Sequence, residues 1–270
     1  EDFATALLRY YQSFGYGDIA SFKAFRWDAK LQRLIGIRHF EAMEMDDIIG
    51  YAHQKEQLID NTEAFVQRKP ANNVLLVGAR GTGKSSAVKA LANVYYSRGL
   101  RILQLTKPQL SHLPDIMDAL RYFASKRFII FLDDLSFEES DAEYKYLKSA
   151  IEGGVESRPE NVLIYATSNR RHLIREKFSD KRELDDELHV NDTVQEKLSL
   201  VARFGVTIYF GAPDKREFQN IVKVLAERYH VTIPEDELLL EANKWELQHG
   251  GLSGRTATQF INHLLGTKEE

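Results

Sequence analysis

The sequence predicts an α/β fold in which a parallel sheet has helices on both faces and a smaller region made only of helices follows. Short apolar runs of strand length recur between residues 74 and 210, and patterns typical of helices separate them. Runs that are apolar throughout are typical of strands buried on both faces, as in parallel sheets. From residue 212 onward only helical patterns remain. We therefore divide the chain into an N-terminal accessory segment (1–45), an αβα domain (46–211) and a helical lid (212–270).

The composition is that of an ordinary globular protein. The 270 residues are 43% hydrophobic and 28% charged, and this length allows one large domain or two smaller ones with a real core. The formal net charge of −4 argues against binding nucleic acid through the average charge, although a local basic face could still contact it. Cysteine is absent, so disulfides and thiolate metal sites are excluded and a cytoplasmic location is expected. No apolar run approaches the roughly 18–20 residues of a membrane span, so we expect no membrane partner.

Residues 1–45 are rich in aromatic side chains. The pattern predicts a helix over 3–14, and the runs Phe22–Trp27 and Leu31–Ile37, joined by polar residues 28–30, could form a hairpin. We interpret this segment as a small accessory subdomain packed on the main domain. The alternative is a docking module for a partner, which an exposed aromatic face would support.

The αβα domain is expected to alternate strands and helices. The expected strands are 74–77, 101–105, 127–132, 162–166 and 206–210, and the expected helices are 53–67, 84–98, 114–125 and 138–152. Glycines at 99, 153 and 154 follow two of these helices, as is common at helix ends. Short buried strands separated by helices indicate a parallel sheet covered on both faces.

The lid is expected to contain three helices. Asp214 can cap the first of them, with Glu217 placed to complete a capping box. The next two helices follow Pro234 and Ser253. One face of the first helix carries the apolar residues Phe218, Ile221, Val222, Leu225 and Tyr229.

A glycine-rich loop joins the first of these five strands to the helix after it. Residues 78–85 match the pattern G-x-x-x-x-G-K-S in the required context of a strand before and a helix after. Backbone N–H groups of such a loop and the helix N-terminus surround phosphate oxygens. Lys84 can reach the β- and γ-phosphates and the Ser85 hydroxyl can bind Mg²⁺, so ATP and Mg²⁺ are the expected cofactors. The candidate nucleotide-binding residues are Gly78, Ala79, Arg80, Gly81, Thr82, Gly83, Lys84, Ser85 and Ser86.

Polar residues end the next strands of the predicted sheet. Asp133 and Asp134 follow the third strand, and acids at the carboxyl ends of parallel strands point into the crevice where ligands bind. Asp133 is the expected Mg²⁺ partner, together with Ser85, and Asp134 is the candidate to polarise the attacking water. Asn169, after the fourth strand, could orient water near the γ-phosphate; the alternative is an ordinary loop asparagine.

Two arginines complete the candidate site. Arg203 precedes the fifth strand and can serve as an arginine finger, which usually faces the site of a neighbouring protomer and so predicts self-association. A surface arginine in a salt bridge is the alternative. Arg255 opens the last helix and could swing from the lid onto the phosphates; the alternative is a capping turn with an incidental arginine.

The order of these features resembles the AAA+ ATPase superfamily from about residue 46 to residue 265. Segments 70–76, 81–86, 167–173 and 196–200, and residues 23–27 of the N-terminal segment, are similar to an uncharacterised bacterial family of AAA+ proteins, a domain of unknown function. The resemblance implies a P-loop NTPase αβα sandwich with a five-stranded parallel sheet in 5-1-4-3-2 order, plus a lid. It assigns Ile48, Ile49 and Gly50 to the adenine, Lys84 and Ser85 to Walker A, Asp133 and Asp134 to Walker B, Asn169 to sensor 1, Arg203 to the finger and Arg255 to sensor 2.

The sequence departs from the commonest AAA+ pattern at Asp134, where most members have glutamate. Paired aspartates also resemble the DnaC and IstB group of helicase and transposase loaders, which use ATP as a switch. Val201 and Ala202 stand where the uncharacterised family prefers a Ser-Asp pair, which leaves Arg203 in place with altered neighbours. Residues 170–193 begin basic and turn acidic, which predicts an exposed helix or, alternatively, a surface for a partner or for nucleic acid.

Two functional hypotheses follow. In the first, the protein hydrolyses ATP with Mg²⁺, self-associates through Arg203, and remodels or loads a macromolecular partner, expected to be a protein. In the second, it is an ATP-dependent switch with little or no intrinsic turnover. A small-molecule phosphotransferase is a weaker third possibility, and the Thr167-Ser168-Asn169 strand end and the Gly254-Arg255 lid helix argue against it.

Overall fold

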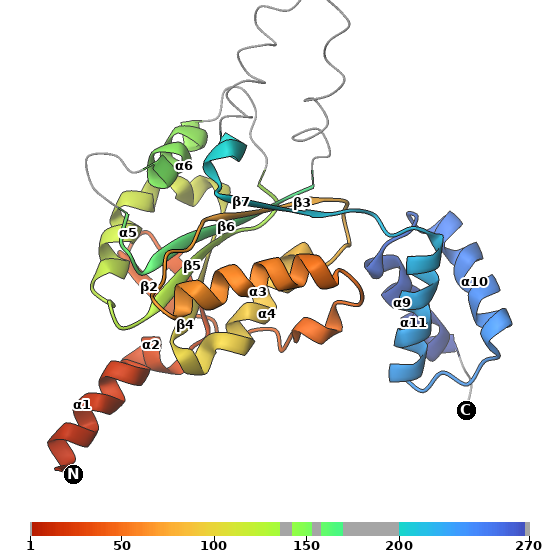
Figure 1. Ribbon diagram of the computed structural model, residues 1–270, viewed down its shortest axis with the longest axis horizontal. Coiled ribbons are helices and arrows are strands. Elements are labelled where there is room, and N and C mark those ends of the chain that lie inside the picture. Colours follow the sequence, from red (N-terminus) through yellow and green to blue (C-terminus); the bar gives the residue numbers. More distant parts are fainter. Residues whose placement is uncertain (1, 136–141, 153–157, 170–199, 268–270) are drawn as a thin grey trace, which may run out of the picture.

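A seven-stranded sheet forms the centre of the molecule (Figure 1). The computed structural model of the protein describes residues 2–135, 142–152, 158–169 and 200–267. The strand order is β2-β1-β4-β5-β6-β3-β7, and every neighbouring pair is parallel except the β1–β2 hairpin. The strands are β1 Ala24–Asp28, β2 Arg33–Gly36, β3 Val74–Gly78, β4 Leu100–Leu105, β5 Arg127–Leu132, β6 Val162–Ser168 and β7 Val206–Phe210.

The five strands from β3 to β7 have the 5-1-4-3-2 order that the resemblance implied. The expected total of five strands was wrong, because the N-terminal hairpin extends the same sheet. β1 pairs in parallel with β4, with Phe25 opposite Leu103, and β2 forms the edge. Ala24, Phe25 and Trp27 are buried, so part of the segment interpreted as accessory contributes directly to the core.

Helices cover both faces of the sheet. The helices are α1 Phe3–Phe14, α2 Gly17–Ser21, α3 Ala52–Val66, α4 Lys84–Tyr95, α5 Leu113–Arg121, α6 Ala142–Glu152, α9 Lys215–Arg228, α10 Glu235–Gln248 and α11 Gly254–Thr267, with 3₁₀ turns at Met45–Asp47 (η1), Tyr96–Arg98 (η2) and Lys107–His112 (η3). Residues of α3 and α4 share one core cluster with Val74 and Leu76 of β3. Residues of α5 and α6 share another cluster with Leu75 and Val77. The alternation along β3 follows from the two-residue period of a strand.

Most helices begin and end close to the expected residues. The helix expected over 84–98 ends at Tyr95, and the 3₁₀ turn η2 continues to Arg98. The next residue, Gly99, adopts φ 94°. The helix expected over 114–125 ends at Arg121. The structure describes the helix expected over 138–152 from Ala142 onward. The segment 170–193 lies outside the described residues.

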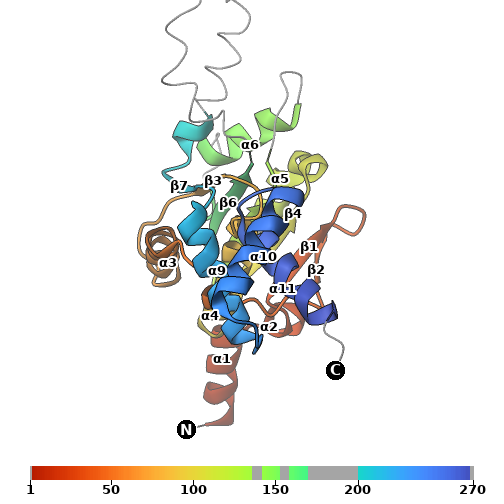
Figure 2. The same ribbon diagram turned by 90° about the vertical axis from the view of Figure 1, so that its right-hand side faces the viewer.

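The C-terminal helices α9, α10 and α11 pack on one another and have their own core (Figures 1 and 2). Phe218, Val222, Ala242, Phe260 and Ile261 are buried there. The capping box is confirmed: the Glu217 N–H donates to Asp214 Oδ1 (2.8 Å) and the Asp214 N–H donates to Glu217 Oε2 (2.8 Å). A short connection after β7 brings this group of helices beside the end of the sheet.

Helix α1 extends away from the body of the molecule (Figures 1 and 2). It exposes large apolar side chains, among them Phe3, Leu8, Tyr10 and Tyr11. The docking alternative requires such an exposed aromatic face, and docking stays a prediction. Within the described ranges, the chain has no helix with the length and apolar character needed to cross a membrane.

Candidate nucleotide-binding site

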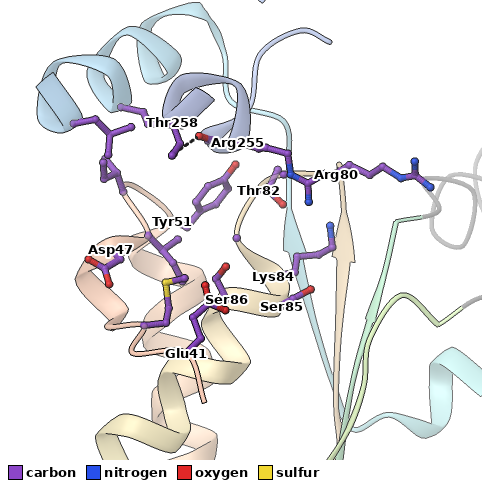
Figure 3. Close-up of a pocket in the computed structure, with 18 of the residues that line it drawn as sticks. Glu41, Asp47, Tyr51, Arg80, Thr82, Lys84, Ser85, Ser86, Arg255 and Thr258 are labelled. Carbon is purple, nitrogen blue, oxygen red and sulfur yellow. Dashed lines mark hydrogen bonds between the residues drawn. The ribbon is translucent and has the colours of Figure 1, made fainter. Parts of the chain in front are cut away.

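A cavity of about 760 Å³ opens where the phosphate loop, the segment before α3 and the C-terminal helices meet (Figure 3). This volume lies within the range typical of small-molecule sites. Most of the residues predicted for the site line it: Ile48, Ile49, Arg80, Gly81, Thr82, Gly83, Lys84, Ser85, Ser86, Asp133, Asp134, Asn169 and Arg255. The structure therefore brings together residues that are far apart in the chain: they directly follow β3, β5 and β6, belong to α4 and α11, or precede α3.

Gly78 and Gly83 show why the backbone of the phosphate loop requires glycine. Gly78 has φ 141°, and a Cβ there would lie 1.9 Å from the carbonyl oxygen of Phe210 in the adjacent strand. Gly83 has φ 92° and is the N-cap of α4, and a Cβ there would lie 2.9 Å from the Ile48 side chain. A residue with a Cβ would be strained at both positions. The loop thus turns tightly from β3 into α4 and leaves the helix N-terminus facing the cavity.

Lys84 is a buried cation at the start of α4. Its side chain reaches into the cavity (Figure 3), and the residue is only 4% exposed. Its Nζ donates to the carbonyl oxygens of Ala79 (2.6 Å) and Gly78 (3.1 Å). Burial lowers the pKa of Lys84 to about 8, although the charges of Asp134 and Asp133 act in the opposite direction. A buried ammonium group held by backbone carbonyls is a suitable partner for an anion.

Asp133 lies at the centre of a hydrogen-bonded group that joins three elements. Its Oδ1 accepts from Ser85 Oγ (2.5 Å) and from Thr167 Oγ1 (2.7 Å). A hydroxyl oxygen of α4 and a carboxylate oxygen from the end of β5 are thereby held together. Mg²⁺ prefers such oxygen ligands and is usually held by one or two protein groups plus substrate phosphates. The hydroxyl of Ser85 and the carboxylate of Asp133 fit that shared mode of binding. No cluster of three or more histidine or acidic side chains that could hold a metal is found in the described part of the chain.

Thr167 near the end of β6 and Asn169 directly after β6 both form hydrogen bonds with Asp134. Its N–H donates to Thr167 Oγ1 (2.9 Å), and its Oδ1 accepts from Asn169 Nδ2 (2.7 Å). Its φ of 55° is uncommon for a residue with a side chain. Thr167 therefore contacts both acids, although the sequence did not predict it for the site. The available signal was its place in the Thr-Ser-Asn run, two residues before Asn169, which was assigned to the site.

The C-terminal helices contact the phosphate loop through Arg255. Its backbone N–H donates to the Gly81 carbonyl (3.2 Å), and a Cβ on Gly81 would lie 2.9 Å from the Arg255 Cβ. Figure 3 shows the Arg255 side chain beside the cavity, on the side where Lys84 and Arg80 lie. Arg80, Lys84 and Arg255 therefore place three cations at the phosphate loop.

Arg203 lies outside this cavity. It sits on the short helical turn before β7 and forms an ion pair with Glu152 at the end of α6. Gly78 and Ala79, also predicted for the site, directly precede the loop residues that line the cavity, and the Ala79 N–H donates to the Phe210 carbonyl (3.1 Å). Gly50 lines a neighbouring cavity next to the connection after β7.

Several lining residues were not predicted from the sequence. Glu41, Met43, Asp47 and Tyr51 come from the segment before α3, and Ile221, Leu225, Arg228 and Tyr229 come from α9 and its end. Arg228 Nη1 donates to Asp47 Oδ1 (2.9 Å) and Nη2 donates to the Asp46 carbonyl (3.0 Å). The only sequence signal for Ile221, Leu225 and Tyr229 was their shared helix face. Arg228 and Asp47 had none, because their contact joins positions far apart in the chain.

Parts of the chain are similar to known proteins. A family model described as "Protein of unknown function (DUF815)" matches residues 20–268. A curated Replication factor C small subunit from Haloarcula marismortui is 26% identical over 143 residues, which are 50% of this chain and 41% of that protein. The aligned stretch thus spans less than half of that relative. Among solved structures, a RuvB variant from Thermotoga maritima aligns with 15% identity and a TM-score of 0.48 over 83% of this chain and 72% of that chain.

Proposed function

The chain belongs to the family described as "Protein of unknown function (DUF815)", within the AAA+ superfamily, and we propose that it binds ATP with Mg²⁺ and hydrolyses it to remodel or load a macromolecular partner. One observation carries this proposal. Ser85 and Asp133, which are hydrogen-bonded to each other, line the same cavity as the buried cation of Lys84, and Thr167 also donates to Asp133. A cation and a pair of metal-binding oxygens in one cavity suit the phosphates of a nucleotide.

Each residue of the cavity has a task in this proposal. Lys84 exchanges its two carbonyl acceptors for phosphate oxygens, and Arg255 neutralises phosphate charge from the other side. Ser85 and Asp133 would hold Mg²⁺, and the ion would supply positive charge beside the phosphate oxygens. The Asp134 carboxylate orients the attacking water, and Asn169 fixes that carboxylate.

The relatives support the general class of activity. The superfamily to which the chain belongs consists of ATPases, and half of the chain aligns with a Replication factor C small subunit. We therefore place this protein among ATPases that assemble into oligomers and act on macromolecules, with the partner expected to be a protein. A cytoplasmic location accords with the absence of cysteine from the sequence.

A second function, an ATP-dependent switch with little turnover, is favoured by the state of Asp134. Its Oδ1 is bound to Asn169, and its side chain is one methylene shorter than glutamate. A carboxylate that stays bound to Asn169 and is set back from the phosphates would polarise water poorly. In that case ATP binding alone would change the conformation or assembly of the protein.

Phosphate release with ATP and Mg²⁺, measured beside equilibrium binding of ATP, separates the two functions. We expect the wild-type protein to turn over and Asp134→Asn to lose roughly 10²–10⁴-fold in rate while its ATP affinity changes little. Asp134→Glu is the matched control, because it keeps the carboxylate. Tight ATP binding without phosphate release at any protein concentration would reject the hydrolase and favour the switch. Failure to bind ATP would reject both.

A further inference from the structure

The connecting segment, residues 37–49, leads from the N-terminal hairpin to α3 and forms one wall of the cavity. It supplies the lining residues Glu41, Ala42, Met43, Asp47, Ile48 and Ile49. Its carboxylates lie apart from the cations of the phosphate loop: Figure 3 shows Glu41 and Lys84 reaching the cavity from different sides. Its lining carboxylates Glu41 and Asp47 are paired with Lys89 and Arg228. The wall also supplies apolar side chains to the cavity, those of Met43, Ile48 and Ile49, so it suits the nucleoside part of a nucleotide.

Side chains from three other elements hold the connecting segment. Lys55 of α3 donates to the Ile48 carbonyl (2.8 Å), and Arg228 of α9 pairs with Asp47 (2.9 Å). Asn93 of α4 donates through Nδ2 to the carbonyls of Met43 (2.7 Å) and Glu41 (3.2 Å). Asn93 thus fixes the part of the wall that has no regular secondary structure.

The oxygen of the Asn93 side-chain amide contacts the residue directly before the hairpin. Its Oδ1 accepts from Nζ of Lys23 (2.8 Å), the residue directly before β1. One half-buried side chain therefore joins the cavity wall to the first strand of the N-terminal hairpin. Both contacts span at least fifty residues of sequence.

Helix α4 connects these contacts to the phosphate loop. Ser85, Lys89 and Asn93 are four residues apart, so they lie on the same face of the helix. Ser85 bonds Asp133, and Lys89 donates to Glu41 Oε2 (3.0 Å). The helix that begins at the phosphate loop therefore also positions the wall.

We propose that Asn93 is a positioning residue for the nucleotide: it holds residues 41–43 against the nucleoside and thereby couples nucleotide occupancy to the β1–β2 hairpin. The inference rests on the proposed function, and it adds a role for a residue that does not line the cavity. It also gives the N-terminal hairpin a part in sensing the nucleotide.

The variant Asn93→Asp tests the positioning role. It keeps an oxygen that can accept from Lys23, but it replaces the donor with an oxygen that faces two carbonyl oxygens. We expect the Kd for fluorescently labelled ADP and the KM for ATP to rise about tenfold, because two hydrogen bonds are lost and repulsion replaces them. The kcat should stay within about twofold, since no catalytic group is touched.

Asn161→Asp is the matched control. Asn161 Nδ2 also donates to two backbone carbonyls, those of Leu120 (3.0 Å) and Phe123 (3.2 Å). It directly precedes β6, whereas the cavity acids follow the opposite, carboxyl end of the parallel strand β5. This variant should lower stability yet leave the Kd of ADP unchanged. An unchanged Kd in Asn93→Asp, or an equal rise in both variants, would overturn the positioning role.

Hydrogen exchange of the wild-type protein tests the coupling without any variant. ADP with Mg²⁺ should slow exchange of the amides of β1 and β2 as well as those of the phosphate loop. In Asn93→Asp, saturating ADP should still protect the loop but not the hairpin. Wild-type protein that binds ADP without protecting the hairpin would overturn the coupling and leave the proposed function intact. A wild-type protein that binds no nucleotide would overturn both.

Discussion

At the scale of single residues, Lys84 shows how burial prepares a binding site. The chain places an ammonium group among backbone carbonyls, where burial lowers its pKa to about 8. Phosphate oxygens nearby would favour the charged form, so nucleotide binding should raise this pKa. Affinity and pH are therefore linked through one proton.

We predict that nucleotide affinity falls as the pH rises above about 8. Below this pH, Lys84 of the free protein is already protonated. Above it, Lys84 must take up a proton when the nucleotide binds, so the affinity should fall by up to about tenfold per pH unit. Titration calorimetry with ADP between pH 7 and 9.5, in buffers of different ionisation enthalpy, measures the proton uptake.

Lys84→Arg is the control for this pH dependence, because arginine keeps its charge throughout the range. The variant should bind without the fall in affinity. An identical fall in both proteins would mean that another group titrates. A flat profile in the wild-type protein would contradict the linkage itself.

Residue types and spacing were sufficient to predict the main cavity groups but not their partners. The pattern around Lys84 and Ser85 and the acids at 133 and 134 marked the phosphate side of the cavity. The contacts of Thr167 with both acids, and of Arg228 with Asp47, depend on tertiary placement. An isolated arginine such as Arg228 carries no local pattern that distinguishes such a contact from exposure to solvent. The Thr-Ser-Asn run marked the end of a strand but did not show that Thr167 would contact both acids.

At the scale of elements, the N-terminal hairpin shows that a local pattern can predict a strand without predicting its partner in the sheet. The alternation of buried Phe25 and Trp27 with exposed Arg26 is visible locally and predicted a strand. Its partner β4 lies more than seventy residues away, with Ala24 opposite Ile102. A two-residue period does not specify which edge a strand joins, so the extension to seven strands could not be predicted.

The N-cap residue Asp214 is expected to stabilise helix α9, and a substitution there tests this. Asp214→Ala removes the acceptor for the Glu217 N–H and should destabilise the C-terminal helices by about 1 kcal/mol. Hydrogen exchange of the α9 amides should accelerate roughly fivefold if they exchange by opening of this helix. Because α9 supplies Ile221 and Leu225 to the cavity, saturating nucleotide should reduce the effect.

Asp236→Ala provides the comparison for the cap. Asp236 lies in the first turn of α10, whose N-cap residue is Pro234 and has no capping side-chain bond. Its removal alters only the interaction with the helix dipole, worth a few tenths of a kcal/mol. Equal acceleration of exchange in both variants, each in its own helix, would show that the capping bond contributes little.

At the scale of the whole molecule, the cavity lies between the sheet with its helices and the C-terminal helices, and these two parts have separate hydrophobic cores. The sheet packs its helices in two clusters, and the C-terminal helices form a third. The two parts meet at the Arg255–Gly81 and Arg228–Asp47 contacts, both beside the cavity. A ligand that touches both parts would therefore favour one arrangement of them.

We predict that Arg203 connects this arrangement to assembly. It lies outside the cavity of its own chain and pairs with Glu152, with a quarter of its side chain exposed. An arginine that acts on phosphate from this position must act on the cavity of another protomer. We therefore predict that phosphate release per protomer rises with protein concentration, as measured across a wide range at saturating ATP and Mg²⁺.

The variant Arg203→Ala tests this assignment, since it should lose about 10³-fold or more in turnover while ATP binding survives. Arg98→Ala is the matched control, because Arg98 forms an exposed ion pair with Glu63 and does not line the cavity. Such exposed pairs contribute little to stability. Glu152→Gln should free Arg203 from its pair and leave turnover intact or higher. If Arg203→Ala and Arg98→Ala turn over alike, or if turnover per protomer is independent of concentration, then each cavity works alone and the Arg203–Glu152 pair has a structural role only.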